Sequence, residues 1–389
     1  MNLKVKKNEY ISKVFVMTVV LIAFAILFFI ANPADNTRSS SLEYSPARII
    51  SVVADHTFFT DPDDPQFYGE PSNMRLGTVI YEVEVLRGSF AGLVLEANYY
   101  IDSPANVFFE VGDQIVVRIF EFDGELSIIE VRHPDRMALI FVVVGVFLIF
   151  LSIIGGKRGV FSVISLIFSV ACVMFLLIPF VIQGYPVILM TLMVLVLIVI
   201  ATGTLLAGIT EKGISAILGC LGGAILSAIF ATIVGSTLHV SGYNMTNAGA
   251  IMNLSDADVS GLFVSSVLVA SIGAVMDATM SVASAMNELK IANPQMGTKD
   301  LFKSGFSVGR DVMGTMSSTL ILAFIGGSLT MIIFMQVTNT SFYQFINHDF
   351  IVMEIVKGVA GSFGIILATP LTALISAKLL TRERKMEKN

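Results

Sequence analysis

The sequence predicts an α-helical polytopic membrane protein with about eight transmembrane helices and one small all-β domain. Three observations lead to this fold class. Only 14% of the 389 residues are charged, whereas a soluble domain carries about 25%, and the mean hydropathy is +0.82. Apolar runs long enough to cross about 30 Å of hydrocarbon recur along the chain. Between the first two runs, the pattern changes to short segments rich in β-branched residues.

The first apolar run, at about residues 11–30, is expected to form transmembrane helix 1. Several lysines lie before it, so residues 1–31 would comprise a basic cytoplasmic terminus and this helix. A secretory signal peptide is the alternative, but the run is long and no small-residue cleavage site follows it, which favours an anchor. Residues 32–45 are rich in Asn, Asp, Ser and Pro and are predicted to form a linker.

Residues 46–134 carry the pattern of a β domain. Short, partly alternating segments rich in β-branched residues are separated by turn sequences such as Arg87-Gly88-Ser89. Five strands in a segment this short indicate a small barrel of the OB type, and a small sandwich is the alternative. The five predicted strands are 49–53, 76–86, 93–101, 114–122 and 126–131.

Transmembrane helices 2–8 are expected within residues 135–379, followed by a basic tail at residues 380–389. Basic residues lie at both ends of the chain and in alternate loops, whereas the loops 184–185, 237–259 and 337–350 contain no Lys or Arg. By the positive-inside rule, both termini are cytoplasmic and the β domain is extracytoplasmic. The seven apolar runs are 137–154, 159–183, 186–208, 213–236, 260–283, 313–336 and 356–379.

Charge divides along the same boundary. Residues 32–136 hold 18 acidic and 7 basic side chains, and the rest of the chain holds 12 acidic and 17 basic ones. This division indicates that the two parts of the chain face different compartments. It is not the charge pattern of a nucleic-acid-binding protein, so no nucleic-acid partner is expected. The two cysteines, Cys172 and Cys220, lie inside apolar runs and are expected to fill core space. The sequence has no zinc-ligand spacing and no nucleotide-binding glycine loop, so no metal and no cofactor are predicted.

Small residues recur at three- and four-residue spacing in several predicted helices. In membranes this spacing lets helix backbones approach closely. We therefore predict that Gly219, Gly223, Gly273, Gly314 and Gly361 lie at helix–helix contacts.

One predicted transmembrane helix carries an acidic residue within its apolar run. Asp277 lies about 17 residues into its run, or roughly 25 Å along a helix rising ~1.5 Å per residue. Gly273, Ser281, Ser284 and Glu288 share its face. An ionisable group inside a membrane must be solvated, paired or neutral, so this face should border a protein interior or a water-accessible path.

The next predicted helix is polar only in its first half. Asp311, Thr315 and Ser318 share a face there, and Arg310 precedes them. In one interpretation Arg310 snorkels to the interface and Asp311 caps the helix amino terminus. In the other, Arg310 or Asp311 communicates with Asp277 across the helix pair, and a carboxyl held between burial and a neighbouring cation exchanges H⁺ near neutral pH. Na⁺ binding by Asp277, Ser281 and Thr315 is equally compatible with the residue types.

Four segments carry a resemblance to a known family. The segments 273–285, 292–294, 301–305 and 309–316 resemble the YibE/YibF family of bacterial membrane proteins, and the likeness extends over essentially the whole chain. The resemblance implies a multi-pass protein of the bacterial plasma membrane. It implies no defined biochemical activity.

A weaker resemblance concerns mechanism. A Gly-x-x-x-Asp helix, a charged stretch and a glycine-rich last helix are similar in order to the membrane half of SecD and SecF, members of the proton-driven RND superfamily. That resemblance implies that Asp277 matches the acid of a proton path. The chain departs from this pattern in having about two more helices and a much smaller outer domain. It also contains only one such membrane half, so a two-half assembly would need a second copy of the chain or another membrane partner.

These observations favour a secondary transporter or proton-coupled export factor, with Asp277 carrying H⁺ or Na⁺ and Arg310 and Asp311 modulating it. The lipid bilayer is its expected environment, and its substrate is unknown. The alternative is a membrane scaffold or envelope sensor whose outer β domain binds a ligand or partner. An intramembrane aspartyl protease would need two paired carboxyls, and the sequences around Asp277 and Asp311 lack the motifs of that class, so no enzyme is predicted.

Overall fold

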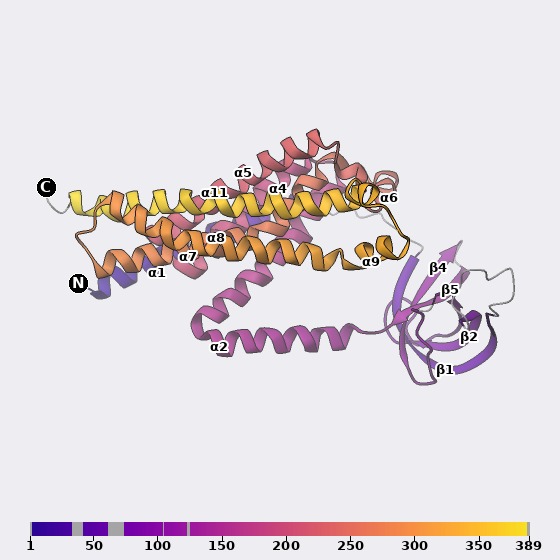
Figure 1. The fold of residues 1–389 in the computed structure, drawn as a ribbon. Helices are drawn as coiled ribbons and strands as arrows, with labels where there is room; N and C mark the ends of the chain where they lie inside the picture. Colours follow the sequence, from indigo (N-terminus) through magenta and orange to yellow (C-terminus); the bar gives the residue numbers. More distant parts are fainter. Residues whose placement is uncertain (1, 33–41, 61–73, 104, 123–124, 387–389) are drawn as a thin grey trace. The chain divides into compact units, whose positions relative to one another are not determined.

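A computed structural model describes residues 2–32, 42–60, 74–103, 105–122 and 125–386 of the chain. The chain divides into two compact units, one formed by Ala34–Phe150 and one formed by Met1–Pro33 with Leu151–Asn389 (Figure 1). The division falls between Phe150 and Leu151, in the first of the two helices that meet at a kink at Gly156.

The first unit contains a closed five-stranded barrel, which confirms the predicted barrel over the sandwich. The strand order is β1-β2-β3-β5-β4, with β3 and β5 parallel and the other neighbours antiparallel. An OB barrel has this order. The strands are β1 (Leu42–Phe59), β2 (Arg75–Val85), β3 (Val94–Ile101), β4 (Gln114–Phe122) and β5 (Glu125–Pro134).

The predicted linker 32–45 is wrong at its end, because β1 already begins at Leu42. Residues 42–48 pair with β4 and residues 47–59 pair with β2, so a single long strand serves both neighbours. Of the residues assigned to the linker, Leu42, Glu43, Tyr44 and Ser45 pair with β4. Residues 33–41 lie outside the described part of the chain.

Alternation along the strands builds the barrel core. On β2, Val79, Tyr81, Val83 and Val85 are buried, while the residues between them are partly exposed. Because successive side chains of a strand point to opposite faces, this period of two fills the barrel interior with one face of each strand. Residues from every strand contribute to this core.

The second unit is helical. Its long helices are α1 (Asn2–Ala31), α2 (Met137–Cys172, shared with the first unit), α4 (Val187–Ala207), α5 (Glu211–Thr237), α7 (Leu262–Ala292), α8 (Thr298–Gly327) and α11 (Asp349–Met386). Its shorter elements are η2 (Val173–Leu177), α3 (Ile178–Ile182), η3 (Gly242–Asn244), α6 (Ala248–Leu254), η4 (Val259–Gly261), α9 (Leu329–Val337) and α10 (Phe342–Ile346).

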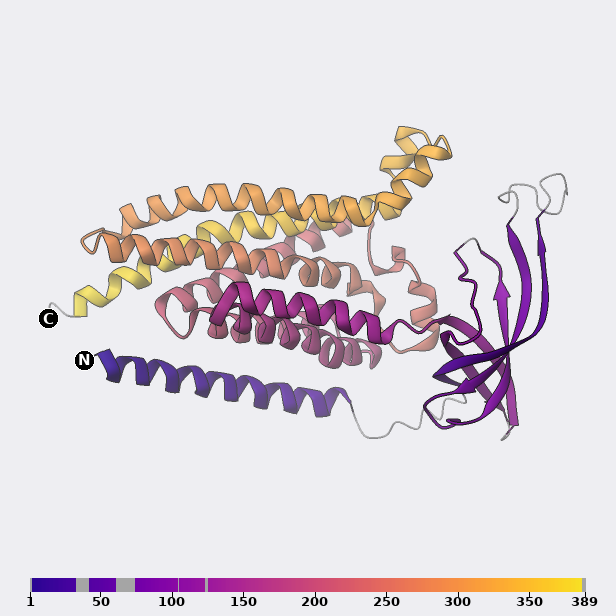
Figure 2. The ribbon, with the colours of Figure 1, turned by 90° about the horizontal axis from the view of Figure 1, so that it is seen from below.

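Seven helices of the described residues are long and apolar enough to cross a membrane. The prediction of many apolar membrane-spanning helices is thus supported. The count is seven and not about eight because Met137–Ile182 is counted as one stretch, although it contains two helices that meet at a kink and correspond to the predicted runs 137–154 and 159–183. Its backbone leaves the helical region at Gly156 (φ 54°, ψ −137°), a conformation that glycine adopts readily. Within the helical unit, α1 begins and α11 ends at the same end (Figure 2).

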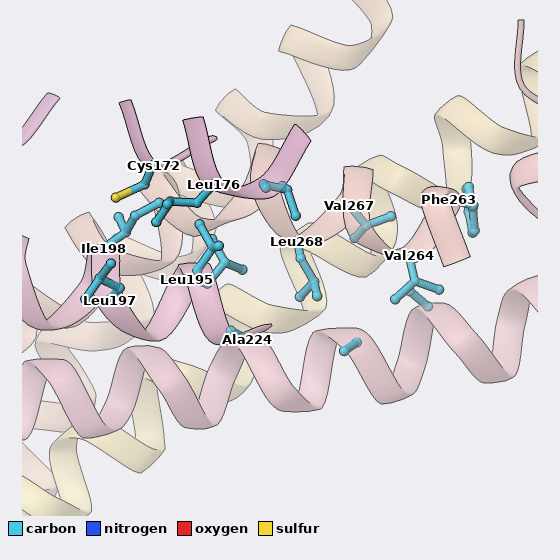
Figure 3. Close-up of a cluster of buried hydrophobic side chains, with 14 of the residues drawn as sticks. Cys172, Leu176, Leu195, Leu197, Ile198, Ala224, Phe263, Val264, Val267 and Leu268 are labelled. Carbon is cyan, nitrogen blue, oxygen red and sulfur yellow. The ribbon is translucent and has the colours of Figure 1, made fainter. Parts of the chain in front are cut away.

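A proline explains the irregular segment after α2. Pro179 lacks the N–H that would bond to the carbonyl of Phe175, and the amide of Asn32, at the end of α1, donates to that carbonyl at 3.0 Å. The helix widens here into the π-helical turn η2, in which Ile178 N–H donates to the carbonyl of Val173. Side chains from η2, α4 and α7 then pack into one apolar core, with Cys172, Leu176, Leu195 and Leu268 fully or nearly fully buried (Figure 3).

The closest helix packing joins α5 to α11 through small residues. A side chain at Gly219 would overlap Thr372, and one at Gly223 would approach the Cβ of Ala368 to 2.5 Å. One turn further, the hydroxyl of Ser227 donates to the carbonyl of Ala360 at 2.8 Å. These contacts support the prediction that Gly219 and Gly223 lie at a helix contact.

Of the other three predicted packing glycines, one lies at a helix contact and two do not. A Cβ at Gly361 would lie 2.7 Å from Leu320 of α8 and 3.0 Å from Ser271 of α7, so Gly361 lies where three helices meet. At Gly273 and Gly314 the prediction is wrong, because a Cβ would meet nothing within 4 Å among the described residues. Both glycines lie on exposed faces of their helices.

Candidate functional site

Asp277 borders a groove between three helices of the helical unit. It is the sixteenth residue of α7, and its side chain lies on an exposed stripe with Gly273 and Ser281. Beside this stripe is a cavity of about 510 Å³ between α2, α4 and α7. Its polar lining consists of Ser162, Ser165 and Ser169 from α2, Thr202 from α4 and Asp277 from α7.

The hydroxyls of the groove are held in place by hydrogen bonds. Ser165 and Thr202 join α2 to α4 through a hydroxyl–hydroxyl bond of 2.6 Å. Ser169 donates to the carbonyl of Ser165 at 2.8 Å, and Ser162 donates to the carbonyl of Arg158 at 3.0 Å. Donation to a carbonyl of the same helix leaves the lone pairs of these hydroxyl oxygens open to a ligand.

The carboxylate of Asp277 stands apart from this network. Within the described part of the chain, no hydrogen bond and no ion pair involves it. A carboxylate has about four acceptor sites, and in an apolar groove an unpaired one is costly. This arrangement is suited to holding a proton, a metal cation or a ligand cation.

The opposite side of α7 is packed. Val275, Ala278 and Val282 are fully buried, and a Cβ at Gly309 of α8 would lie 3.5 Å from Val282. This places α8 behind α7 as seen from the groove. Asp277 therefore faces α2 and α4 and not α8, because positions 277 and 282 lie on different sides of the helix.

The α8 residues predicted to assist Asp277 lie elsewhere. Arg310, Asp311, Thr315 and Ser318 are all exposed, and the guanidinium of Arg310 lies 5.0 Å from the ring centroid of Phe306, in its own helix. No interaction among the described residues joins any of them to Asp277.

The hydroxyls of α8 are used within the helix. Thr315 donates to the carbonyls of Asp311 and Val312, and Ser318 donates to that of Gly314. The interpretation of Asp311 as a helix cap is wrong, because α8 begins thirteen residues earlier, at Thr298. Residues 298–312 extend the helix although they are polar, since one face, including Leu301, Gly305 and Gly309, is buried.

Sequence reasoning found Asp277 and missed its surroundings. Ser162, Ser165 and Ser169 follow one another at i, i+3 and i+7 on an otherwise apolar helix, which is the spacing of a single face. That pattern could have flagged them. The π-helical turn η2 could not be foreseen from spacing, although such turns are frequent at functional sites, and its Val173 and Met174 line the same groove.

Ligation of a metal by protein groups alone receives no support from the described residues. No group of three or more His, Cys, Asp or Glu side chains is gathered there. The sodium set of Asp277, Ser281 and Thr315 is also not assembled, because Thr315 lies on the exposed side of α8.

Comparison with known proteins gives one match. The model of the family described as YibE/F-like protein matches residues 143–382, which include α4 to α10 and most of α2 and α11. No curated protein and no solved structure matches the chain, so the likeness to the SecD and SecF membrane half gains no support. Since the matched segment covers more than half of the 389 residues, the chain belongs to the YibE/F-like family.

Proposed function

We propose that this protein is a secondary transporter or proton-coupled export factor in which Asp277 is the ion-carrying group. The observation that carries the proposal is an unpaired carboxylate on a long apolar helix, bordering a groove that also holds four hydroxyl groups. Ionisable residues in membrane-spanning segments mark ion and proton paths more often than structural contacts. H⁺ is the simplest coupling ion, and Na⁺ is the alternative.

The proposed cycle uses the groove as the place of exchange. Asp277 takes up an ion from one side of the membrane, and the surrounding hydroxyls of Ser165, Ser169 and Thr202 solvate it. A change in the contact between α7 and the α2–α4 pair then exposes the carboxylate to the other side. Alternating access of this kind moves one group of helices against another around a fixed site.

Proton flux into liposomes tests the proposal. The purified protein is reconstituted with a trapped pH-sensitive dye, and a potassium diffusion potential drives protons inward. Wild-type protein is expected to acidify the lumen above the rate of empty liposomes, and Asp277→Asn is expected to return the rate to that baseline, because an amide cannot carry the proton. Uptake of radiolabelled Na⁺ under the same potassium diffusion potential tests the alternative ion.

The matched control is Asp300→Asn, which removes an exposed acid from the first turn of α8, away from the groove. It should keep the wild-type rate. Reconstitution yield and gel-filtration profile of all variants exclude misfolding as the cause of a loss. Wild-type flux of both ions through Asp277→Asn would refute the assignment of Asp277.

A pocket on the barrel favours a second candidate, a membrane scaffold or envelope sensor. A cavity of about 370 Å³ lies at the rim of β3 and β5, lined by Tyr99, Tyr100, Asn106, Arg132 and Arg136 among others. Arg132 pairs with Glu130 at 3.3 Å and the lining also includes Asp102, so an anionic ligand would be held mainly by Arg136 together with the tyrosines and the amide. Under this role Asp277→Asn would leave cellular function intact, and loss of the two arginines would abolish it.

A further inference from the structure

We propose that the groove beside Asp277, which is defined by its lining from α2, α4 and α7, binds amphiphilic organic cations. This inference rests on the proposed function and names the substrate class of the same site. It would make the protein an exporter of lipophilic cations whose substrate and coupling ion meet at one carboxylate.

The apolar lining sets the first property of the ligand. Apart from its five polar groups, the groove is formed by aliphatic and methionine side chains, including Met174, Leu195, Ile198, Val269 and Met276. A cavity of about 510 Å³ falls within the range typical of sites for small organic molecules. A ligand that fills it must bury a large apolar surface, which excludes a hydrophilic ion or sugar as the main occupant.

The charge of the lining sets the second property. Asp277 is the sole ionisable side chain among the lining residues, and no Lys, Arg or His lies with it. A single unpaired carboxylate in an apolar site attracts a cation and repels an anion, and it does so strongly because the local dielectric is low. The ligand therefore carries one positive charge next to its apolar body.

The distribution of polar groups sets the orientation of the ligand. Ser162, Ser165, Thr202 and Asp277 lie toward one end of the groove, together with Leu206 near the end of α4. Val173 and Met174 of η2 form the other end. The charged group thus lies at the α4–α5 end, and the apolar body extends toward η2.

Gly273 keeps the groove open. It lies one turn from Asp277 and lines the cavity, and a Cβ built there meets nothing within 4 Å. A larger side chain at this position would extend into the space that the ligand needs, without disturbing the packed side of α7. This gives a steric test that leaves the carboxylate in place.

A pair of matched probes tests the inference. Tetraphenylphosphonium and tetraphenylborate have nearly the same shape and opposite charge. Equilibrium binding of each is measured to the full-length protein in nanodiscs, with empty nanodiscs subtracted. Wild-type protein should bind the phosphonium saturably and the borate at least roughly tenfold more weakly, as expected when a contact to a charged group is lost.

Two variants separate charge from shape. Asp277→Asn and Gly273→Leu should each weaken phosphonium binding at least roughly tenfold, the first by removing the charge and the second by filling the groove. Gly314→Leu is the matched control, because Gly314 also has open space around it but lies on α8, outside the groove. It should bind like wild type.

Several outcomes would overturn the inference. Absence of saturable phosphonium binding to wild type, or equal binding by Asp277→Asn, would refute it. Equal affinity for the borate would mean that the groove holds lipid tails without regard to charge. Failure of this inference is distinct from failure of the proposed function: Asp277-dependent proton flux without phosphonium binding refutes the substrate class alone, and phosphonium binding without flux leaves a cation site and refutes transport.

Discussion

Single residues decide how closely the helices approach. Glycines at 219, 223 and 361 are covered by neighbouring helices, while Gly273 and Gly314, with similar spacing in sequence, are open. Spacing identifies the residues that share a helix face, but it does not say which faces are covered. The sequence could therefore predict small-residue faces and could not predict which of them pack within one chain.

The covered and open glycines make a matched stability test. Gly223→Leu should lower the free energy of unfolding by about 1–3 kcal/mol or more, because added methylenes in a packed contact force side chains and backbone apart. Gly314→Leu should be neutral or slightly stabilising, since glycine is a poor helix former by about 1 kcal/mol. Cys172 and Cys220 are both fully buried, so a fluorogenic thiol-reactive dye reports the unfolding temperature directly.

The two glycine variants also test the packing itself. A lower unfolding temperature for Gly223→Leu alone would support the α5–α11 contact. Equal losses in both variants would show that the exposed face of α8 is also covered, in an assembly of more than one chain. No loss at Gly223 would contradict the close contact with Ala368.

The residue found most readily from sequence was Asp277, because a charge in an apolar run stands out against its neighbours. Its partners were predicted on α8, where Arg310 and Asp311 follow in sequence, but the groove is formed by α2 and α4, more than 70 residues earlier. Adjacent helices in sequence do pack here, as α7 and α8 show. The spacing of residues shows which of them share a side of α7. It does not show which helix packs against that side, because this depends on the arrangement of the whole bundle.

At the scale of elements, the barrel was the most predictable part. Alternation predicted β2, β3 and β4 to within one or two residues. The beginning of β1 was missed because Ser45-Pro46 reads as a loop in composition, whereas in the barrel the hydroxyl of Ser45 is buried and donates to the carboxylate of Glu43 at 2.6 Å.

The hydrogen bonds of the Glu43 carboxylate predict how the stability of the barrel changes as the pH falls. The hydroxyl of Ser45 and the backbone N–H of Ser89, 3.0 Å away, lower the pKa of Glu43 from its ordinary value of 4.5. A lowered pKa in the folded state means that the ionised form stabilises folding above the unfolded-state pKa. This stabilisation is lost as the pH falls below about 4.5 and through the lower folded-state value.

Acid unfolding of residues 42–134, which contain the whole barrel core, measures this effect. Glu43→Gln should be less stable than wild type at pH 7, and the difference should shrink as the pH falls below 4.5. The control is Glu110→Gln, which alters an exposed acid of the β3–β4 connection. A difference for Glu43→Gln that stays constant with pH would contradict the role of its charge.

At the scale of the whole molecule, the charge pattern and the helix pattern agree on one point. Positive charges at both ends predict termini on the same side of the membrane, and α1 begins and α11 ends at the same end of the helical unit (Figure 2). The runs 137–154 and 159–183 are separated in sequence by Gly155-Gly156-Lys157-Arg158, and the two helices that they form meet at the kink at Gly156.

The orientation of the chain in the membrane can be tested at two glutamines. Gln344 in α10 lies in the predicted outer loop 337–350, and Gln295 lies between α7 and α8 beside Lys290 and Lys299. Both are exposed. With both native cysteines replaced by serine, Gln344→Cys should react with a membrane-impermeant maleimide in intact cells, and Gln295→Cys should react only after permeabilisation, since positively charged loops are retained in the cytoplasm. The reverse labelling would invert the assigned topology and place the β barrel inside the cell, and labelling of both sites in intact cells would contradict α8 and α9 as a membrane crossing.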